Sequence, residues 1–378
     1  MKISVLQENL ARGLSIVSRA VSPRSTLPVL SNILVATDGA RLRLSATNLE
    51  LGITCWINAK ILEEGSTTVP SRTFSDLVST MPPKQADIAL DESTQTLNVK
   101  CGSLNTDIKC IDAQEFPPMP TPDLDFGIEI NVDDLKEMIN QVGFAASRDE
   151  ARPVLTGVLV TVENDEITMA AADGFRLSVR TASLASSVQR SVEAVIPARA
   201  LGELARISGD GSEVVTMFLP PNRGQVIFRT KDIELTSQVI EDTFPNYRQI
   251  IPQSYKTRTI LNTVEFLKAS KQAEIFAREG SLIAQVNITP GSEEMVPGEV
   301  EILGESEETG SSQSVLESTI EGPGMAISFN VRYLREVLDV IKTPNVALET
   351  TQSTSPGVIR PVGEDNFLHV IMPMHPRD

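Results

Sequence analysis

Few side chains in this sequence have the types and spacing that catalysis or metal binding requires. The two histidines, His369 and His375, are six residues apart, which matches neither an HExxH motif nor a ligand pair on one helix face. Asp123 and Asp125 could hold a hard cation, but the prolines around them favour a solvated linker. A GxSxG elbow and a GxxxxGKS/T phosphate loop are both absent from the sequence. We therefore expect no catalytic residue, no metal site and no cofactor.

The C-terminal residues raise a different chemical question, because the apolar run Val370, Ile371, Met372, Pro373 and Met374 stands only four residues before the end of the sequence. An apolar tail would fray or aggregate unless the fold held it in place. Methionine side chains are flexible and can pack around different apolar ligands. We predict that the tail is the last strand of a repeated unit and forms one wall of a binding groove.

Length and composition restrict the class of protein. A chain of 378 residues exceeds what one hydrophobic core usually serves, so two or three domains are expected. The formal net charge of -17 argues against a nucleic-acid partner, yet net charge does not reveal how charge is distributed. The three cysteines, Cys55, Cys101 and Cys110, form no CxxC pair and suit a reduced compartment. With no secretory signal and no apolar stretch of membrane-spanning length, the sequence predicts a cytoplasmic protein.

Two groups of motifs recur at nearly the same period. Pro117, Pro245 and Pro373 each follow Phe or Met and are spaced by 128 residues (245 − 117 and 373 − 245). The segment LPVLSNILV at 27–35 is similar to RPVLTGVLV at 152–160, an offset of 125 residues. A repeat of this length is a normal domain size and predicts three tandem domains. We place their boundaries at residues 1–122, 127–253 and 257–378.

The segments between these motifs have the same order in each repeat. Helical spacing of apolar residues predicts a first helix within 4–22, 131–147 and 262–277. Alternation with turn residues predicts strand pairs within 31–53, 156–179 and 281–303. A second amphipathic helix is predicted within 71–82, 198–209 and 331–342. Further strands close each repeat, so the fold class is α+β.

A threefold repeat with these motifs is similar to the bacterial DNA polymerase III beta subunit family, the sliding clamps. The resemblance rests on RSTLPVLSNIL, AADGFRLSV and the terminal VIMPM, with support from FPNYRQIIP and SFNVRYLREVL, and it covers the whole chain. It implies three tandem copies of the DNA-clamp (processivity-fold) domain, with helices lining a pore and sheets outside. Two chains would form a head-to-tail dimeric ring around duplex DNA, conferring processivity on the replicative polymerase without a catalytic site.

The resemblance also implies the residues that do this work. A clamp needs diffuse phosphate contacts and no base readout, and the expected DNA-binding residues are Arg24, Arg72, Arg148 and Arg152. The expected peptide-binding groove consists of Leu155, Ala172, Gly174, Phe175, Arg176, Leu177, Pro245, Gln249, Ile250, Val370, Ile371, Met372, Pro373 and Met374. Within it, Arg176 could bond a peptide carbonyl. The dimer interface is expected near Ile108, Ile275 and Phe276.

The partners that the resemblance implies are duplex DNA and proteins that carry clamp-binding peptides. These proteins are the replicative polymerase alpha subunit, the clamp loader, and other polymerases and repair proteins. The sequence departs from the family at Phe175, where a more polar ring is common, and at His375, where arginine is usual. Two alternatives stay open: an interaction protein of the same fold that never encircles DNA, and an enzyme built on repeated α+β domains. The apolar groove residues could also be ordinary core.

Overall fold

The computed structural model describes residues 1–22, 26–120, 127–188, 190–211, 213–220, 224–292 and 296–374. Contacts divide the chain into two compact units, Met1–Asp133 with Arg199–Val239, and Asp134–Ala198 with Ile240–Asp378. The middle third of the sequence therefore contributes to both units. These units are groups of contacts and do not test the three predicted domain boundaries, which stay predictions.

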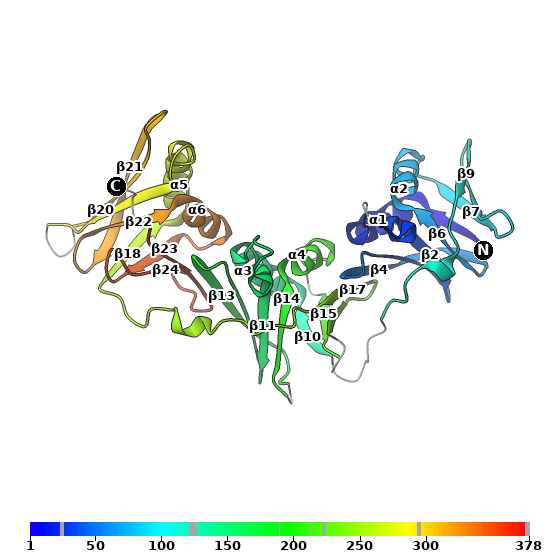
Figure 1. The fold of residues 1–378 in the computed structure, drawn as a ribbon, viewed down its shortest axis with the longest axis horizontal. Coiled ribbons are helices and arrows are strands. Elements are labelled where there is room, and N and C mark those ends of the chain that lie inside the picture. The colour runs from blue at the N-terminus through cyan, green and yellow to red at the C-terminus, as the bar shows by residue number, and fades with distance from the viewer. Residues whose placement is uncertain are drawn as a thin grey trace. The chain divides into compact units, whose positions relative to one another are not determined.

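The first unit contains two antiparallel sheets. The smaller has the order β5 (Lys60–Glu63), β1 (Lys2–Leu6), β7 (Gln85–Asp91), β8 (Thr96–Cys101) and β9 (Leu104–Lys109). The larger has the order β10 (Ile128–Asn131), β15 (Val214–Phe218), β16 (Gln225–Arg229), β17 (Ile233–Gln238), β4 (Leu51–Asn58), β3 (Arg41–Thr47), β2 (Asn32–Asp38) and β6 (Ser66–Pro70). The helices are α1 (Gln7–Val17), α2 (Ser71–Thr80) and α4 (Ala198–Ile207). Helix α1 packs on β4 and α2 (Figure 1) because Leu10, Leu14 and Val17 form one buried face.

The second unit is built on one twelve-stranded sheet. Its order is β14 (Val192–Pro197), β11 (Gly157–Glu163), β12 (Glu166–Ala172), β13 (Arg176–Ser183), β25 (Phe367–Ile371), β24 (Gly357–Pro361), β23 (Asn345–Thr350), β18 (Thr257–Asn262), β21 (Gly310–Glu321), β20 (Gly298–Ser306), β19 (Ile283–Thr289) and β22 (Met325–Asn330). The helices are α3 (Val132–Val142), α5 (Thr263–Ala277) and α6 (Val331–Val340). Strand β25 joins β13 to β24, so the end of the chain connects two sets of strands.

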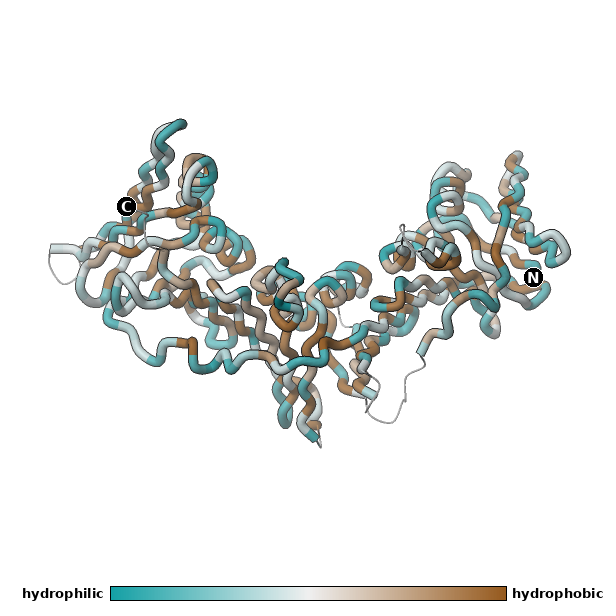
Figure 2. Tube along the Cα trace, viewed as in Figure 1, coloured by the Kyte–Doolittle hydropathy of each residue, from teal (hydrophilic) through white to brown (hydrophobic). Residues whose placement is uncertain are grey.

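All six predicted helices are present, although most are shorter than their sequence patterns. In the first repeat, residues 2–6 form strand β1 and the helix begins only at Gln7. The reason is that Ile3 and Val5 are buried in a strand that pairs with both β5 and β7. The strands carry long hydrophobic stretches, whereas the tip of the β20–β21 hairpin is hydrophilic (Figure 2).

The repeat extends to individual hydrogen bonds. The side-chain oxygen of Asn48 accepts hydrogen bonds from the amides two and three residues later, at 3.0 and 2.7 Å. The side chain of Asp173, 125 positions further on, accepts the equivalent bonds at 2.9 and 3.1 Å. The residue after each acceptor has a positive φ, +78° at Leu49 and +96° at Gly174. Both units therefore contain the same turn, and the turn at Asp173 begins the candidate site.

Candidate functional site

The C-terminal tail is fixed by backbone hydrogen bonds, as a closing strand should be. Strand β25 pairs antiparallel with β13, with Leu177 opposite Val370. Beyond the strand, the amide of Met372 donates to the carbonyl of Phe175 at 2.8 Å. The amide of Met374 donates to the carbonyl of Ser328, also at 2.8 Å. The prediction that the tail is a strand is confirmed for Val370 and Ile371, whereas Met372 and Met374 lie beyond the strand and are held by these two backbone hydrogen bonds.

Next to this strand lies an apolar floor, formed by one cluster of buried side chains. The cluster comprises Leu155, Leu159, Ala170, Ala172, Leu177, Val179, Val195, Phe244, Tyr247, Val358 and Val370. Three large apolar side chains within three positions of a cluster member in sequence stay exposed: Phe175 at 53%, Ile250 at 43% and Met372 at 37%. Apolar surface of this kind, next to a buried floor, is typical of an interaction site.

The other predicted groove residues are divided between surface and core. Gly174, Pro245 and Gln249 are exposed, whereas Pro373 and Met374 are half-buried. Ile371 is buried in a separate cluster, beneath α5 and α6. A Cβ at Gly174 would lie 3.1 Å from Nη1 of Arg152, so Arg152 lies beside the turn at Gly174. Sequence reasoning had assigned Arg152 only to DNA.

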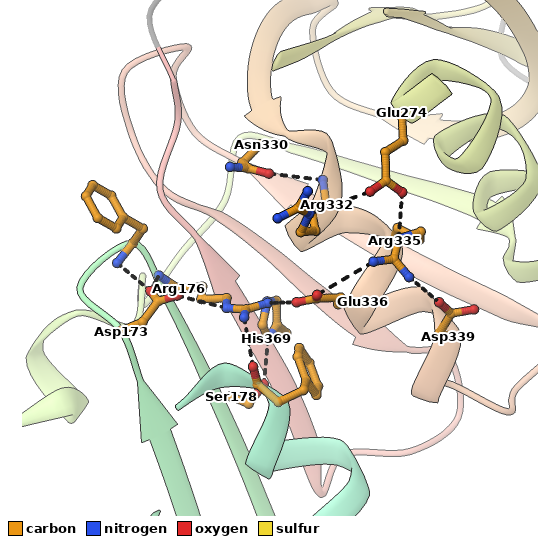
Figure 3. A network of polar contacts seen from close by, with 12 residues as sticks. Asp173, Arg176, Ser178, Glu274, Asn330, Arg332, Arg335, Glu336, Asp339 and His369 are labelled. Atoms are coloured by element: carbon orange, nitrogen blue, oxygen red, sulfur yellow. Dashed lines mark hydrogen bonds and ion pairs between the residues drawn. The ribbon is translucent and has the colours of Figure 1, made fainter. Parts of the chain in front are cut away.

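The guanidinium of Arg176 lies inside the protein and is fully engaged (Figure 3). Its Nε donates to Asp173 at 3.1 Å, its Nη2 donates to the carbonyl of Phe144 at 2.7 Å, and its Nη1 is paired with Glu336. The ring of Tyr333 lies 4.3 Å from its central carbon. With a side chain only 8% exposed, Arg176 holds the turn at Asp173 in place, and these contacts occupy the guanidinium that was expected to bond a peptide carbonyl.

The ion pairs continue from Arg176 along α6 to α5 (Figure 3). Glu336 lies 3.6 Å from Arg335, and Arg335 lies 2.6 Å from Glu274 on α5 and 3.2 Å from Asp339. This network connects the turn that carries Phe175 to two helices more than 90 residues away in sequence. Sequence reasoning missed the partners on α6, because only the helical period of 331–342 could be read and not the face that meets Arg176.

A neutral histidine occupies the interior of the same region. His369 is fully buried, its Nδ1 lies 2.6 Å from the hydroxyl of Ser178, and its ring stacks on Phe144 with centroids 5.4 Å apart. Its Nε2 has no hydrogen-bond partner among the described residues. Burial, and then the positive charge of Arg176, lower the pKa of His369 well below its usual 6.5.

This histidine predicts an acid-sensitive stability. Below pH 6.5 the unfolded chain protonates His369 while the folded chain does not, so folding stability from this group falls as pH drops and is constant above that range. The slope reaches about 1.4 kcal/mol per pH unit. Urea denaturation at pH 7.5, 6.5 and 5.5 should show a smaller acid loss in His369→Gln than in the unmodified chain. Parallel curves for the two proteins at all three pH values would contradict this assignment.

The predicted DNA-binding residues occur in both units. Arg72 is exposed on α2 of the first unit, with its Nε 3.8 Å from Asp76. Arg148 and Arg152 are exposed in the second unit, where Arg152 lies 3.3 Å from Asp149. Arg24 lies outside the described residues.

The predicted dimer-interface residues lie on the edge strand β9 and on helix α5. Ile108 is buried on β9, the last strand of its sheet, whereas Ile275 is exposed and Phe276 half-buried on α5. Residues 310–318 of β21 pair with β20, and only 319–321 pair with β18. The other edge of 310–318 therefore has no strand partner within the described part of the chain. An unpaired strand edge can pair with a strand of another chain. The free edge of β21 was not predicted from the sequence.

Two features are absent from the described residues. Among them, no cluster of three or more His, Cys, Asp or Glu side chains could hold a metal ion. Within the same ranges, no helix is long and apolar enough to cross a membrane.

The repeated α+β units, with strand β25 pairing between β13 and β24, form a clamp-type fold. Three family models match in succession: DNA polymerase III beta subunit N-terminal domain at residues 1–120, central domain at 129–246 and C-terminal domain at 248–375. The chain therefore consists of three clamp domains and belongs to the DNA polymerase III beta subunit family. Its function is that of a beta sliding clamp, a processivity factor without a catalytic site of its own.

Individual relatives are similar to this chain over nearly its full length. The beta sliding clamp of Synechococcus elongatus is 30% identical over 100% of both chains. That of Bacillus subtilis is 29% identical over 99% of both. The crystal structure of the DNA polymerase sliding clamp from Bacillus subtilis matches with a TM-score of 0.93, 29% identity and 100% coverage of both chains. The DNA polymerase III subunit beta from Pseudomonas aeruginosa matches with a TM-score of 0.90 and 25% identity, again over 100% of both chains.

Proposed function

We propose that two copies of this chain close head to tail around duplex DNA and recruit partner proteins through the groove. The observation that carries the proposal is the exposed apolar set Phe175, Ile250 and Met372 beside a buried apolar floor. Short apolar peptides suit such a surface because they bury it without needing a matching fold. The partners would be the polymerase alpha subunit, the clamp loader, and other polymerases and repair proteins in the cytoplasm.

The DNA contacts of this ring would be loose. Arg24, Arg72, Arg148 and Arg152 supply positive charge without base readout, which lets a protein remain on duplex DNA and still slide. A net charge of -17 is compatible with this function, because the acidic residues can lie away from the surface that meets DNA.

The ring would close where strand edges are available. We propose that β9, with Ile108, meets the free edge of β21 from the second copy, beside Ile275 and Phe276 on α5. Antiparallel pairing of these edges would satisfy their open backbone groups. The proposed domains that build the ring are residues 1–122, 127–253 and 257–378.

A topological assay tests the ring. The protein is loaded onto nicked circular DNA with a clamp loader and ATP, the complex is isolated, and the DNA is then linearised. We expect the protein to be retained on the circle and released by cutting, because a ring slides off a free end. Equal retention on circle and line would instead indicate ordinary affinity binding, and no retention on either would favour an interaction protein that never encircles DNA.

A seam variant is the matched control for that assay. Ile275→Asp places a charge at the proposed interface, and we expect it to sediment as a monomer and to be lost from the circle. Val264→Asp changes an apolar residue on the same helix that is still more exposed, 71% against 53%, and lies outside the proposed seam, so this variant should behave as the unmodified chain. Identical sedimentation of the two variants would contradict the seam.

A further inference from the structure

Leu49, in the first unit, combines an exposed apolar side chain with a backbone conformation that leucine rarely adopts. Its side chain is 50% exposed and its φ is +78°. A bulky residue in the left-handed region is strained, whereas glycine adopts this conformation at little cost. The second unit has glycine at the equivalent place, Gly174 with a φ of +96°. Neither the exposure nor the strain of Leu49 stabilises the folded chain, and strained backbone is concentrated at functional sites.

Hydrogen bonds hold Leu49 in this conformation. Its amide donates to Oγ1 of Thr47 at 3.0 Å, and its carbonyl accepts from Nε2 of Gln238, 189 residues away, at 3.0 Å. A strained conformation persists only where the surrounding structure fixes it. The turn therefore depends on tertiary contacts, which present the side chain of Leu49 to solvent at a defined place.

The backbone around Leu49 repeats that of the proposed groove. The amide of Gln238 donates to the carbonyl of Glu50 at 2.9 Å, and in the second unit the amide of Met372 donates to the carbonyl of Phe175 at 2.8 Å. Glu50 and Phe175 are 125 positions apart, the same offset as the turns that precede them. The first unit therefore has the backbone of the groove with a carboxylate in place of an aromatic ring, so a ligand of this surface must differ in charge.

A buried apolar cluster joins the two segments that carry exposed leucines. The cluster comprises Val29, Leu30 and Phe116, with Leu34, Ile111 and Met119 packed against it. Leu27, two residues before the first cluster member, is 50% exposed. A Cβ at Gly52, three residues after Leu49, would lie 2.5 Å from Cε of Met119. Both leucines therefore belong to segments that meet at this cluster, and they add exposed apolar surface beside it.

Glu50 supplies a negative charge next to Leu49. It is exposed, and its carboxylate makes no hydrogen bond or ion pair with any residue in the described part of the chain. A free carboxylate beside apolar side chains is complementary to a peptide that has a cation next to its apolar residues.

We propose that Leu27, Leu49 and Glu50 form a second docking surface, the Leu49 surface, for an extended peptide with two apolar residues and an adjacent lysine or arginine. This surface lies in the first unit and does not involve the C-terminal tail. It therefore goes beyond the proposed function of the groove and gives each chain a second place for a partner protein.

Three fluorescent peptides, acetylated and amidated, test the Leu49 surface by anisotropy. The first has lysine beside two leucines, the second has glutamate in place of lysine, and the third keeps lysine but has serines in place of the leucines. Binding is measured on the full chain and on the chain that lacks Met372–Asp378, in which strand β25 keeps its partners. Because the deletion removes a wall of the proposed groove, binding by the shortened chain reports the Leu49 surface.

We expect the shortened chain to bind the lysine and leucine peptide. The glutamate peptide should bind about fivefold more weakly at low salt, and this difference should shrink as salt rises. The serine peptide should not bind detectably. It controls for the general attraction of a basic peptide to a chain of net charge -17.

Matched variants assign the binding to Leu49. Leu49→Asn should weaken the lysine and leucine peptide about tenfold, because an apolar contact is lost while asparagine tolerates the left-handed conformation. Leu62→Asn changes an equally exposed leucine, 51% against 50%, on β5 of the same unit and should keep full affinity. Glu50→Gln should remove the difference between the lysine and glutamate peptides.

The stability of a glycine variant tests the reason why Leu49 is present. Leu49→Gly should weaken peptide binding as much as Leu49→Asn, yet its melting midpoint should not fall below that of the unmodified chain, because glycine relieves the strained backbone. A lower melting midpoint would show that Leu49 serves the fold and would overturn the proposal.

The remaining outcomes separate the Leu49 surface from the groove. If the shortened chain does not bind the lysine and leucine peptide, or if Leu49→Asn and Leu62→Asn have equal affinity, the Leu49 surface is overturned and the groove stands. Equal binding of the serine peptide would overturn it too, since the attraction would then be general. Failure of the groove would appear separately, as a partner peptide whose affinity the deletion does not change.

Discussion

Deleting Met372–Asp378 should weaken partner-peptide binding at least about 100-fold while leaving the two-chain assembly intact. The exposed Met372 and half-buried Met374 would form one wall of the proposed groove, and losing two methionine contacts would remove several kcal/mol of apolar burial. Strand β25 ends at Ile371, so its pairing with β13 and β24 remains. Fluorescence anisotropy measures the affinity, and sedimentation measures the assembly.

Two point variants test whether peptide binding depends on apolar surface at the proposed groove or on exposed apolar surface anywhere. Met372→Ser should weaken peptide binding about tenfold, because one exposed apolar contact is lost. Leu62→Ser removes a more exposed apolar side chain, 51% against 37%, on β5 of the first unit and should leave binding unchanged. Normal peptide binding by the truncated chain would show that the groove lies elsewhere.

Replacing Arg176 with methionine should destabilise the second unit by about 3 kcal/mol. The substitution keeps most of the side-chain volume but leaves Asp173 and Glu336 without the cation that they share, and removing one partner of a buried pair costs about 3–5 kcal/mol. We place the effect at the lower end because Glu336 retains Arg335. Urea denaturation followed by circular dichroism measures the loss. Peptide affinity should fall as well, since the turn before Phe175 loses its anchor.

Arg332 provides the comparison within the same network. Its guanidinium is half-exposed and contacts Glu274 at 3.6 Å, so Arg332→Met should cost less than about 1 kcal/mol. Adding Glu336→Leu to Arg176→Met should recover part of the loss, because it removes one of the uncompensated charges. If the Arg176 and Arg332 variants lost equal stability, Arg176 would not be the buried anchor that its contacts indicate.

Much of the fold was predictable from local patterns. Helix α6 was predicted from the spacing of Leu334, Val337 and Leu338, and these residues are buried on one face. The repeat was visible from prolines 128 residues apart and from similar segments 125 residues apart. Strand β1 was missed, since its five residues merge in sequence with the helical pattern that follows.

The candidate site was predictable only in part. The AADGFRL and VIMPM motifs gave its residues through resemblance, but not which of them are exposed. Arg176 was expected to bond a peptide carbonyl, but its contact with Glu336 was not foreseen, because Glu336 lies 160 residues away on a helix whose orientation no local pattern reveals. Arg152 was assigned to DNA, and the structure places it beside Gly174.

The sequence by itself determined the threefold repeat, the positions of the helices and the strand at the end of the chain, because propensity and periodicity act over a few neighbouring residues. Only the tertiary structure decided what each side chain in that strand does. Val370 joins the buried cluster next to the proposed groove, whereas its neighbour Ile371 is buried with α5 and α6. Successive residues of a strand point to opposite faces, and which face meets which cluster is fixed only when distant strands pair.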